Sequence, residues 1–579
     1  MNNDSIQNND FDKIKKALES GDYSLAEELI IHSKKQFPRD VGVYILEGEL
    51  YLCTKRPKDA VDCIEKGLAL DSSDYELYFI LGEAYELLGK HKLAELYYRY
   101  AAYQCHNRDD LIYLNQNIER FLQVSANSLP GLSIFIPVGQ NADWLKLFLK
   151  MLALYAQKDR YELLFLKSNP SDELCKWLDR QTLGKVISCA DGEHSRLYNL
   201  AIEASDPYSD LVLIEEGELP LEHTLCTLQA ELYQDEDTAA AGSISNHPAY
   251  ASYMKSTSPC IEDAMRYAHR FNIPSHASHQ NVLDLSDTIL MIKRSMIKQY
   301  GWFDEAFKKP YYQKRDLFFR FINNNRNIKL CLNSLALTTA VKPFTWVPEE
   351  LDLFYKKWRI NLAYSCFSRT DLLQLIKIGG GPTLRILEIG CACGATLIEI
   401  GQRFPGSELH GIELDEGPAS IAKHFAAIKN NNIETSDMNY PENFFDYIIL
   451  GDVLEHLHRP ELVLQNIKKY LKGDGHILVS IPNVMHMSVI KPLLGGYWTY
   501  ENAGILDRTH LKFFTYQEIL LMFERTGYRV SEIRATTIPL SEEDLQLAKT
   551  LATIRNVPEV WFEAYQYLLC ADCGRKESL

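Results

Sequence analysis

Small residues at alternate positions mark one bend of the chain as a ligand site. Gly390, Ala392 and Gly394 follow directly on the apolar run 384–389. Residues with little or no side chain let a ligand approach the backbone and leave main-chain N–H groups exposed to it. Glu413 follows the next apolar run, 23 residues after Gly390, where a carboxylate can accept hydrogen bonds from both hydroxyls of a ribose. The spacing indicates a site for a ribose-containing cofactor, although dinucleotide enzymes share the glycine-marked turn and many such turns bind nothing.

Five segments that could position these residues come in order along the carboxy-terminal part of the chain. They are the strand-like run 384–389 with its bend, the run 408–412, residues 434–438, the run 445–451 with its loop to 457, and the turn and strand at 471–483. This series resembles class I S-adenosylmethionine-dependent methyltransferases over about residues 360 to 535. The resemblance implies an α/β Rossmann-like fold and S-adenosylmethionine as the cofactor.

The same resemblance implies a role for nine residues of the cofactor site. Glu388, Gly390, Ala392 and Gly394 would cradle the methionine end, Glu413 the ribose, Asp437 and Met438 the adenine, and Asp452 and Val453 would lie beside the sulfonium. Ala392 replaces the family's middle glycine, and we expect its extra methyl group to be tolerated. A nicotinamide-dependent enzyme is the rival interpretation, and the block 452–456 and the turn at 474–475 argue against it.

Two histidines are candidates for proton removal. Methyl transfer from a sulfonium is an in-line displacement that needs no metal, but a hydroxyl acceptor must lose its proton. His456 follows the fourth strand, and His510 lies in the block 506–515, which resembles one found in methyltransferases associated with glycan assembly. Asp507 could orient His510 or pair with Arg508. We hypothesise that His456 or His510 deprotonates a sugar hydroxyl; the alternative for His456 is a helix-terminal residue bonded to the backbone.

The middle of the chain alternates strand-like and helix-like segments, which predicts a mostly parallel sheet covered by helices. Its motifs resemble family 2 glycosyltransferases of the GT-A fold over about residues 131 to 340. The matching segments are 133–138, 195–201, 210–214, 292–295 and 300–305. Such enzymes use a nucleotide-sugar as donor, so the resemblance implies a nucleotide-sugar as a ligand of this middle part.

The acidic residues of that family are altered here. Lys167 and Ser168 stand where it has an acid for the nucleotide base. Glu216 and Glu218 are the candidate ligands for Mg²⁺ or Mn²⁺ if this part is active. Lys314, ahead of Asp316, takes the place of the general base, and an ammonium group accepts no proton unless its pKa is strongly lowered. An active transferase, a sugar-binding relic and a structural domain all remain open, and the altered acids favour the latter two.

The first part of the chain is repetitive. Ala26, Ala60 and Ala94 recur at intervals of 34 residues, as do Gly48 and Gly82. Small residues at these positions allow two antiparallel helices to approach closely, and the pattern resembles tetratricopeptide repeats over about residues 10 to 125. The repeats could hold a protein partner or pack against the rest of the chain, and the sequence does not decide between these roles.

Composition limits what the whole chain can be. It has 579 residues, a net charge of −17 and a hydrophobic content of 46%, which is typical of a multidomain globular protein. The acidic balance argues against nucleic-acid binding, and no apolar run reaches the ~20 residues of a membrane span. The first ten residues show no secretory signal, and the thirteen cysteines are mostly isolated, so we expect a cytoplasmic protein. The terminal pair Cys570 and Cys573 lacks two further ligands for zinc.

These observations predict a multidomain chain with three folded parts. The boundaries are 10–125 for all-α helical repeats, 131–340 for the α/β GT-A-like domain, 341–383 for a linker and 384–579 for the Rossmann-like methyltransferase domain with its tail. The predicted function is methylation of a sugar hydroxyl on a glycan or glycoconjugate precursor. Two alternatives remain: a bifunctional glycosyltransferase and methyltransferase, and a repeat-based adaptor whose catalytic domains are relics.

Overall fold

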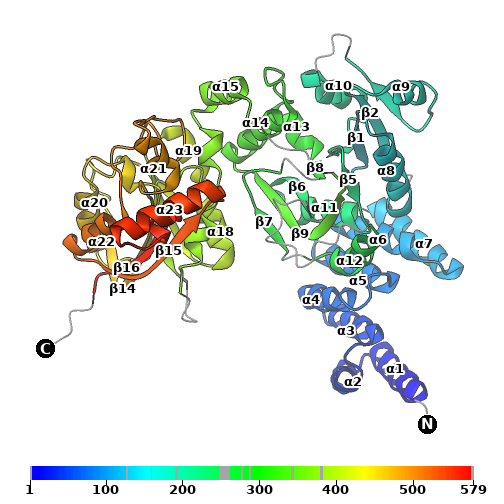
Figure 1. Cartoon of the computed structure of the whole chain (residues 1–579). Helices are drawn as coiled ribbons and strands as arrows, with labels where there is room; N and C mark the ends of the chain where they lie inside the picture. The colour runs from blue at the N-terminus through cyan, green and yellow to red at the C-terminus, as the bar shows by residue number, and fades with distance from the viewer. Residues whose placement is uncertain are drawn as a thin grey trace. The chain divides into compact units, whose positions relative to one another are not determined.

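The chain forms two compact units, Met1–Thr345 and Trp346–Leu579. In the computed structural model the described residues are 3–124, 128–157, 160–189, 194–246, 261–275, 278–285, 289–340, 345–377 and 383–574. Figure 1 shows the elements of both units along the chain. The sequence predicts separate domains for the repeats and for the middle sheet, whereas the structure joins them in one unit.

Seven helices open the first unit, and each packs against the next. They are α1 (Asn3–Ser20), α2 (Tyr23–Gln36), α3 (Val41–Cys53), α4 (Pro57–Leu68), α5 (Tyr75–Leu87), α6 (His91–Gln104) and α7 (Arg108–Val124). Helices α2, α4 and α6 begin at residues 23, 57 and 91, so the 34-residue period of the sequence is the period of the structure. The side chains of Asp40 and Asp74, one period apart, each accept a backbone N–H at a helix start. The helical character is confirmed, and the tetratricopeptide assignment stays a prediction.

The glycines of the repeats lie where two helices meet. A β-carbon on Gly48 would lie 2.7 Å from Ile64, and one on Gly82 would lie 2.4 Å from the ring of Tyr98. Both distances are below van der Waals contact, so no larger residue fits without movement of the neighbouring helix. The Tyr98 hydroxyl donates a 2.6 Å hydrogen bond to Glu86, which holds the ring in this position.

A mixed sheet forms the rest of the first unit. Its strands are β1 (Leu132–Val138), β2 (Tyr161–Lys167), β3 (Lys185–Ile187), β4 (Asp210–Leu213), β5 (Glu218–Pro220), β6 (Thr238–Ser245), β7 (His279–Asn281), β8 (Leu290–Ile292) and β9 (Asn327–Thr338). Their order is β3-β2-β1-β4-β8-β6-β9-β5, with β7 also paired to β9. The first four strands in this order, β3, β2, β1 and β4, run parallel to one another. Strand β8 is antiparallel to both of its neighbours, β4 and β6.

Helices accompany this sheet and connect it to the repeats. They are α8 (Ala142–Tyr155), α9 (Asp172–Leu178), α10 (Leu197–Ala204), α11 (Thr224–Gln234), α12 (Ile261–Phe271), α13 (Arg294–Tyr300) and α14 (Pro310–Asn323). Helix α11 packs on α6, and one apolar core contains Tyr97 of the repeats together with Cys226 and Ala230 of α11. The hydroxyl of Tyr100 lies 2.5 Å from Nδ1 of His223 in the same buried contact. A shared core makes the repeats part of the folding unit of the sheet.

The second unit is a seven-stranded sheet. Its strands are β10 (Arg385–Ile389), β11 (Glu408–Glu413), β12 (Ala427–Asn430), β13 (Phe445–Gly451), β14 (Leu471–Pro482), β15 (Arg529–Thr537) and β16 (Ala564–Asp572), in the order β12-β11-β10-β13-β14-β16-β15. All neighbours are parallel except β16, which is antiparallel to β14 and to β15. The direction of strand succession reverses between β10 and β13, and in such sheets ligands bind at the carboxyl ends of the strands that flank this point.

The helices of this unit include a segment that the sequence assigns to a linker. They are α15 (Pro348–Trp358), α16 (Leu362–Ser365), α17 (Thr370–Leu373), α18 (Ala395–Arg403), α19 (Glu416–Ala422), α20 (Pro460–Ile467), α21 (Met487–Leu494), α22 (Tyr516–Arg525), α23 (Glu542–Arg555) and α24 (Val560–Glu563). Helices α15 to α17 lie inside the expected linker 341–383. Pro348 is the first residue of α15, where its missing N–H costs nothing. The glycines at 379–381 in this segment lie outside the described residues.

The tail completes the sheet of the second unit. The apolar run 561–570 of the tail lies mostly in β16, which is inserted between β14 and β15. The third strand, β12, precedes the segment 434–438, which forms turns. None of the helices described in either unit combines the length and the apolar character that crossing a membrane requires.

The bend after β10 has a left-handed backbone at three positions. The φ angles are 72° at Gly390, 47° at Ala392 and 84° at Gly394. Glycine adopts this conformation freely, whereas a β-carbon clashes with the following carbonyl at a cost of about 1–2 kcal/mol. The alanine expected to be tolerated therefore carries backbone strain.

Substitution of Gly82 tests the close approach of the helices. We expect Gly82→Ala to lower the free energy of unfolding of the first unit by about 1–3 kcal/mol, because the added carbon overlaps a ring that cannot move freely. Chemical denaturation measures the change. Gly473→Ala is the control, since nothing lies within 4 Å of its β-carbon position. An equal, small effect of both substitutions would contradict this account of the repeat glycines.

Substitution of Ala392 tests the strain in the bend. Ala392→Gly is expected to raise the free energy of unfolding of the second unit by about 1 kcal/mol, because glycine relieves the left-handed strain. Ala395→Gly, in the first turn of α18, should lower it by about 0.5–1 kcal/mol. Thermal unfolding of both variants checks the opposite signs, and a destabilised Ala392→Gly would show that the bend is unstrained.

Candidate functional site

A pocket of about 400 Å³ lies at the carboxyl ends of β10 and β13. Four segments far apart in the sequence line it: the bend after β10, the loop after β13, the helical segment 363–369 and the loop 504–510, with two residues of β16. It brings together seven of the residues predicted from the sequence: Glu388, Gly390, Ala392, Asp452, His456, Asp507 and His510. The topology and the motifs thus converge on one place.

Glu413 is hydrogen-bonded to the bend. One of its carboxylate oxygens accepts the N–H of Ala392 at 2.8 Å, and the other accepts the N–H of Asp415 at 2.9 Å. Burial raises the pKa of this carboxyl group above its ordinary value. The side chain predicted to hold a ribose and the bend predicted to hold the methionine end are therefore one connected structure.

Glu388 is a buried carboxyl group with an incomplete set of partners. It is the penultimate residue of β10 with 4% of its surface exposed, and its Oε2 has no hydrogen-bond partner among the described residues. Burial raises its pKa to about 8, although the hydroxyl of Thr396 and the charge of Arg369 oppose this shift. An uncompensated acid beside a pocket favours a positively charged ligand.

Asp452 is held by residues that the sequence did not single out. Arg369 donates to it at 2.6 Å, and Ser480 donates at 2.8 Å. Gln566 of β16 also donates to it. Arg369 falls in the expected linker, so its role carried no signal, whereas the polar Gln566 inside the apolar run 561–570 could have drawn attention.

The two histidines meet edge to face. Their ring centroids are 4.8 Å apart, His456 Nδ1 lies 3.2 Å from the carbonyl of Thr509, and His510 Nδ1 lies 2.8 Å from the carbonyl of Ile505. Burial and the neighbouring His510 lower the pKa of His456, which favours its neutral form. The structure brings the two candidate bases together, and their role as bases stays a prediction.

Asp507 has other partners than expected. Its carboxylate accepts the N–H and the hydroxyl of Thr509 at 2.8 and 2.6 Å, and the hydroxyl of Tyr364 at 3.2 Å. Arg508 donates instead to Asn502. Because a backbone carbonyl already takes Nδ1 of His510, the predicted orienting bond from Asp507 is not formed, and Asp507 stabilises the loop that carries the histidine.

Five predicted cofactor residues lie outside the pocket lining: Glu413, described above, and four others. Asp437 is exposed and accepts the hydroxyl of Tyr470 at 2.5 Å, while Met438 is buried in the apolar core. Val453 packs against the bend, since a β-carbon on Gly390 would lie 2.8 Å from it. Gly394 precedes α18 and faces Ala422. The adenine contacts of Asp437 and Met438 stay predictions.

The acidic segment of the middle sheet is occupied by internal contacts. Glu218 is buried in β5 and accepts the hydroxyl of Thr338, and Glu216 accepts the N–H of Asn141 at 3.3 Å. Lys314, almost fully buried, pairs with Glu215 at 2.5 Å. An ammonium group thus lies against the first acid of this segment, and the Mg²⁺ or Mn²⁺ site at Glu216 and Glu218 stays a prediction.

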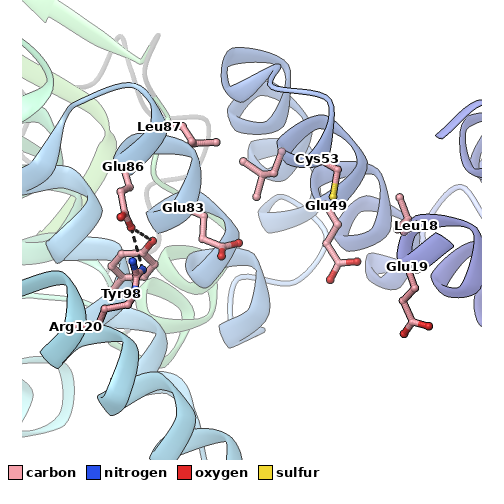
Figure 2. Close-up of a pocket in the computed structure, with 10 residues that line it drawn as sticks. Leu18, Glu19, Glu49, Cys53, Glu83, Glu86, Leu87, Tyr98 and Arg120 are labelled. Atoms are coloured by element: carbon pink, nitrogen blue, oxygen red, sulfur yellow. Dashed lines mark hydrogen bonds and ion pairs between the residues drawn. The ribbon is translucent and has the colours of Figure 1, made fainter. Parts of the chain in front are cut away.

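A second cavity, of about 560 Å³, lies on the helical repeats. Figure 2 shows Glu49 and Glu83 among the side chains that line it, with Glu86 bonded to Tyr98 and Arg120. Burial and the neighbouring acids raise the pKa of Glu83 to about 7. This cavity contains none of the residues that the sequence predicts for catalysis or cofactor binding, so the pocket of the second unit is the candidate active site.

Comparisons with known proteins agree with this choice. A family model described as a methyltransferase domain matches residues 358–533. The ubiquinone biosynthesis O-methyltransferase of Aeromonas salmonicida is 25% identical over 174 residues, which is 29% of this chain and 72% of that protein. The malonyl-[acyl-carrier protein] O-methyltransferase of Bacillus cereus is 29% identical over 114 residues, 19% of this chain and 42% of that protein.

A solved structure is also similar to part of the chain. It is a SAM-dependent methyltransferase from Archaeoglobus fulgidus, with 21% identity, a TM-score of 0.27, and coverage of 38% of this chain and 98% of that chain.

The pocket fits the cofactor of this family. The Oε2 of Glu388, without a partner among the described residues, suits a ligand that carries an ammonium and a sulfonium group, and Gly390 of the bend lines the same pocket. The matched segment contains Glu413 and the pocket residues Gly390, Ala392, Asp452 and His510. Residues 358–533 form a class I S-adenosylmethionine-dependent methyltransferase domain, and the chain is a methyltransferase.

Proposed function

We propose that the chain transfers the methyl group of S-adenosylmethionine to a hydroxyl oxygen of a sugar in a glycan or glycoconjugate precursor. One observation carries this proposal: the cofactor bend and the two histidines line the same pocket. The methyl donor and a hydroxyl group can therefore meet without movement of the sheet. The two relatives named above are both O-methyltransferases by name, which supports oxygen as the accepting atom.

The cofactor supplies an electrophilic methyl group, and the residues of the chain bind and orient it. Glu413 accepts hydrogen bonds from the ribose hydroxyls, and Glu388 balances the positive charge of the methionine end. Arg369 and Ser480 keep Asp452 at the carboxyl end of β13, beside the reacting centre. These fixed contacts align the methyl carbon with the incoming oxygen, which is the main requirement of a displacement.

Aromatic side chains beside His510 support a sugar as the acceptor. The ring of Phe513 lies 6.4 Å from that of His510, and Trp498 packs edge to face on Phe513 at 5.4 Å. Trp498 and Tyr500 are 39% and 43% exposed, so flat apolar faces remain open to solvent next to the pocket. Such faces suit the C–H surface of a sugar ring, while His456 and His510 contact its hydroxyl group.

The described part of the middle sheet gives no support for sugar transfer as a second activity. Glu215 is paired with Lys314, and Glu218 is buried. Both acids are therefore already engaged within the protein. We therefore propose a binding or structural role for this sheet and for the repeats that share its core.

Mass spectrometry tests the proposal on the acceptor. Cell glycans are compared with and without the chain, and the loss of one methyl group from a defined sugar is the expected result. Calorimetry of the full chain with S-adenosylmethionine, and separately with nucleotide-sugars and Mn²⁺, tests each binding site. Unchanged glycans together with methylation of another class of molecule would contradict the sugar acceptor.

Substitution of Glu413 is expected to weaken cofactor binding. Glu413→Gln removes the charge from two hydrogen bonds to the ribose, each worth about 1.5–3 kcal/mol when charged. We expect the affinity for S-adenosylmethionine to fall about 10- to 100-fold in calorimetry. Glu416→Gln, three residues on and exposed, serves as the control. Equal affinities of the two variants would remove Glu413 from the cofactor site.

Cofactor binding is expected to release a proton from Glu388. With a pKa of about 8 in the free protein, the group is protonated at pH 7, and a cationic ligand lowers that pKa. Calorimetry in buffers of different ionisation enthalpy should reveal a release of up to about one proton at pH 7, absent in Glu388→Gln. The same raised pKa implies that stability falls as the pH rises from about 4.5 to 8, because only the unfolded state ionises there. Identical proton release in both proteins would contradict this assignment.

A further inference from the structure

Three side chains of types that commonly ligate metal ions lie close together in the lining of the pocket. Glu455, His456 and His510 each offer one donor atom, and these atoms all lie within 4.8 Å of one another. Glu455 and His456 belong to a short 3₁₀ turn after β13, Leu454–His456, whereas His510 comes from the loop 504–510. All three line the pocket, and the cofactor contacts described above use none of them.

Glu455 is the unusual member of this group. It is 1% exposed, and neither of its carboxylate oxygens has a hydrogen-bond partner among the described residues. A buried carboxylate without a partner costs several kcal/mol, so such groups are generally paired or bound to a cation. The nearest guanidinium, that of Arg369, is already bonded to Asp371 and Asp452.

The backbone of Glu455 also holds the loop that carries His510. Its carbonyl oxygen accepts the N–H of Leu511 at 2.8 Å and that of Lys512 at 3.0 Å. The loop that carries His510 is therefore attached directly to the turn that carries Glu455 and His456. This attachment makes the arrangement of the three donors a property of the fold.

Both histidines are oriented as metal ligands commonly are. Each Nδ1 lies within hydrogen-bond distance of a backbone carbonyl, of Thr509 for His456 and of Ile505 for His510. A carbonyl only accepts, so Nδ1 carries the hydrogen and Nε2 retains its lone pair. A bond from the second ring nitrogen to a carbonyl is the usual means by which a protein fixes the tautomer of a metal-binding histidine.

We propose that Glu455, His456 and His510 bind a divalent cation of the Zn²⁺ or Mn²⁺ type, and that this cation activates the acceptor hydroxyl. One carboxylate and two imidazoles form a ligand set that leaves coordination positions open. The cation site stands on these residues alone, whereas its role in activation rests on the proposed function. The histidines then act as ligands, in place of the direct base expected from the sequence.

The reaction balances with this cation in place. Coordination lowers the pKa of the acceptor hydroxyl, whose proton leaves to water. The oxygen then forms a bond to the methyl carbon as the carbon–sulfur bond breaks, and the electron pair of that bond stays on sulfur. The neutral products are the methyl ether and S-adenosylhomocysteine, and the cation is unchanged.

Calorimetry of the full chain with MnCl₂ or ZnCl₂ tests the site without cofactor or acceptor. After removal of metals with a chelator, we expect Glu455→Gln and His510→Ala to weaken binding of at least one of the two ions at least 30-fold. His458→Ala is the matched control, because this exposed histidine lies two residues from His456 and pairs with Glu434, outside the proposed ligand set. Binding that is identical in the wild type, Glu455→Gln and His458→Ala would overturn the proposal.

Thermal unfolding gives a second readout that does not depend on activity. Glu455→Gln removes an unpaired buried acid, so the metal-free variant should unfold at a higher temperature than the wild type. Added metal should raise the unfolding temperature of the wild type and leave that of the variant unchanged. A metal-induced rise of equal size in both proteins would refute the site. Binding of S-adenosylmethionine is measured in the same samples. If the wild type binds the cofactor but no metal ion, the metal site is refuted and the methyltransferase function stands; if it fails to bind the cofactor, the proposed function itself is contradicted.

Discussion

The hydrogen bond from the N–H of Ala392 to Glu413 is the contact on which the active site depends. It ties the end of β11 to the bend after β10 and holds three left-handed residues in one conformation. The reversal of strand succession places β13 on the other side of this bend, and so brings Asp452 and the histidines to the same opening. Without this contact the bend would lose its shape, and the pocket would lose one wall.

Two buried acids line the pocket. They are Glu388 and Glu455, and each lacks a complete set of partners within the described protein. The protein thus retains unfavourable groups in the one place where ligands can compensate them, as is common at functional sites. On our proposals the first acid faces the cationic cofactor and the second faces a metal ion. The stability lost to each acid is recovered when its ligand binds.

Much of this site was predictable from the sequence, and the limits have physical causes. Gly390, Glu413 and Asp452 lie at or just after the ends of apolar runs of strand length, so local patterns indicate them. Arg369 lies between α16 and α17, two helices of four residues each, which are too short to show a helical period. The prolines and glycines of the surrounding segment 341–383 also resemble a domain boundary. The burial of Glu455 depends on a loop more than fifty residues away, and no local pattern records such a contact.

The position of β16 bears on how the protein is made. This strand is hydrogen-bonded on both sides, between β14 and β15, and it supplies Gln566 to the site. While the chain is still on the ribosome, the sheet of the second unit has a gap that only residues 564–572 can fill. The nascent methyltransferase domain therefore stays incomplete until this segment has left the exit tunnel. The unit that precedes it contains all its own strands and can fold earlier, during translation.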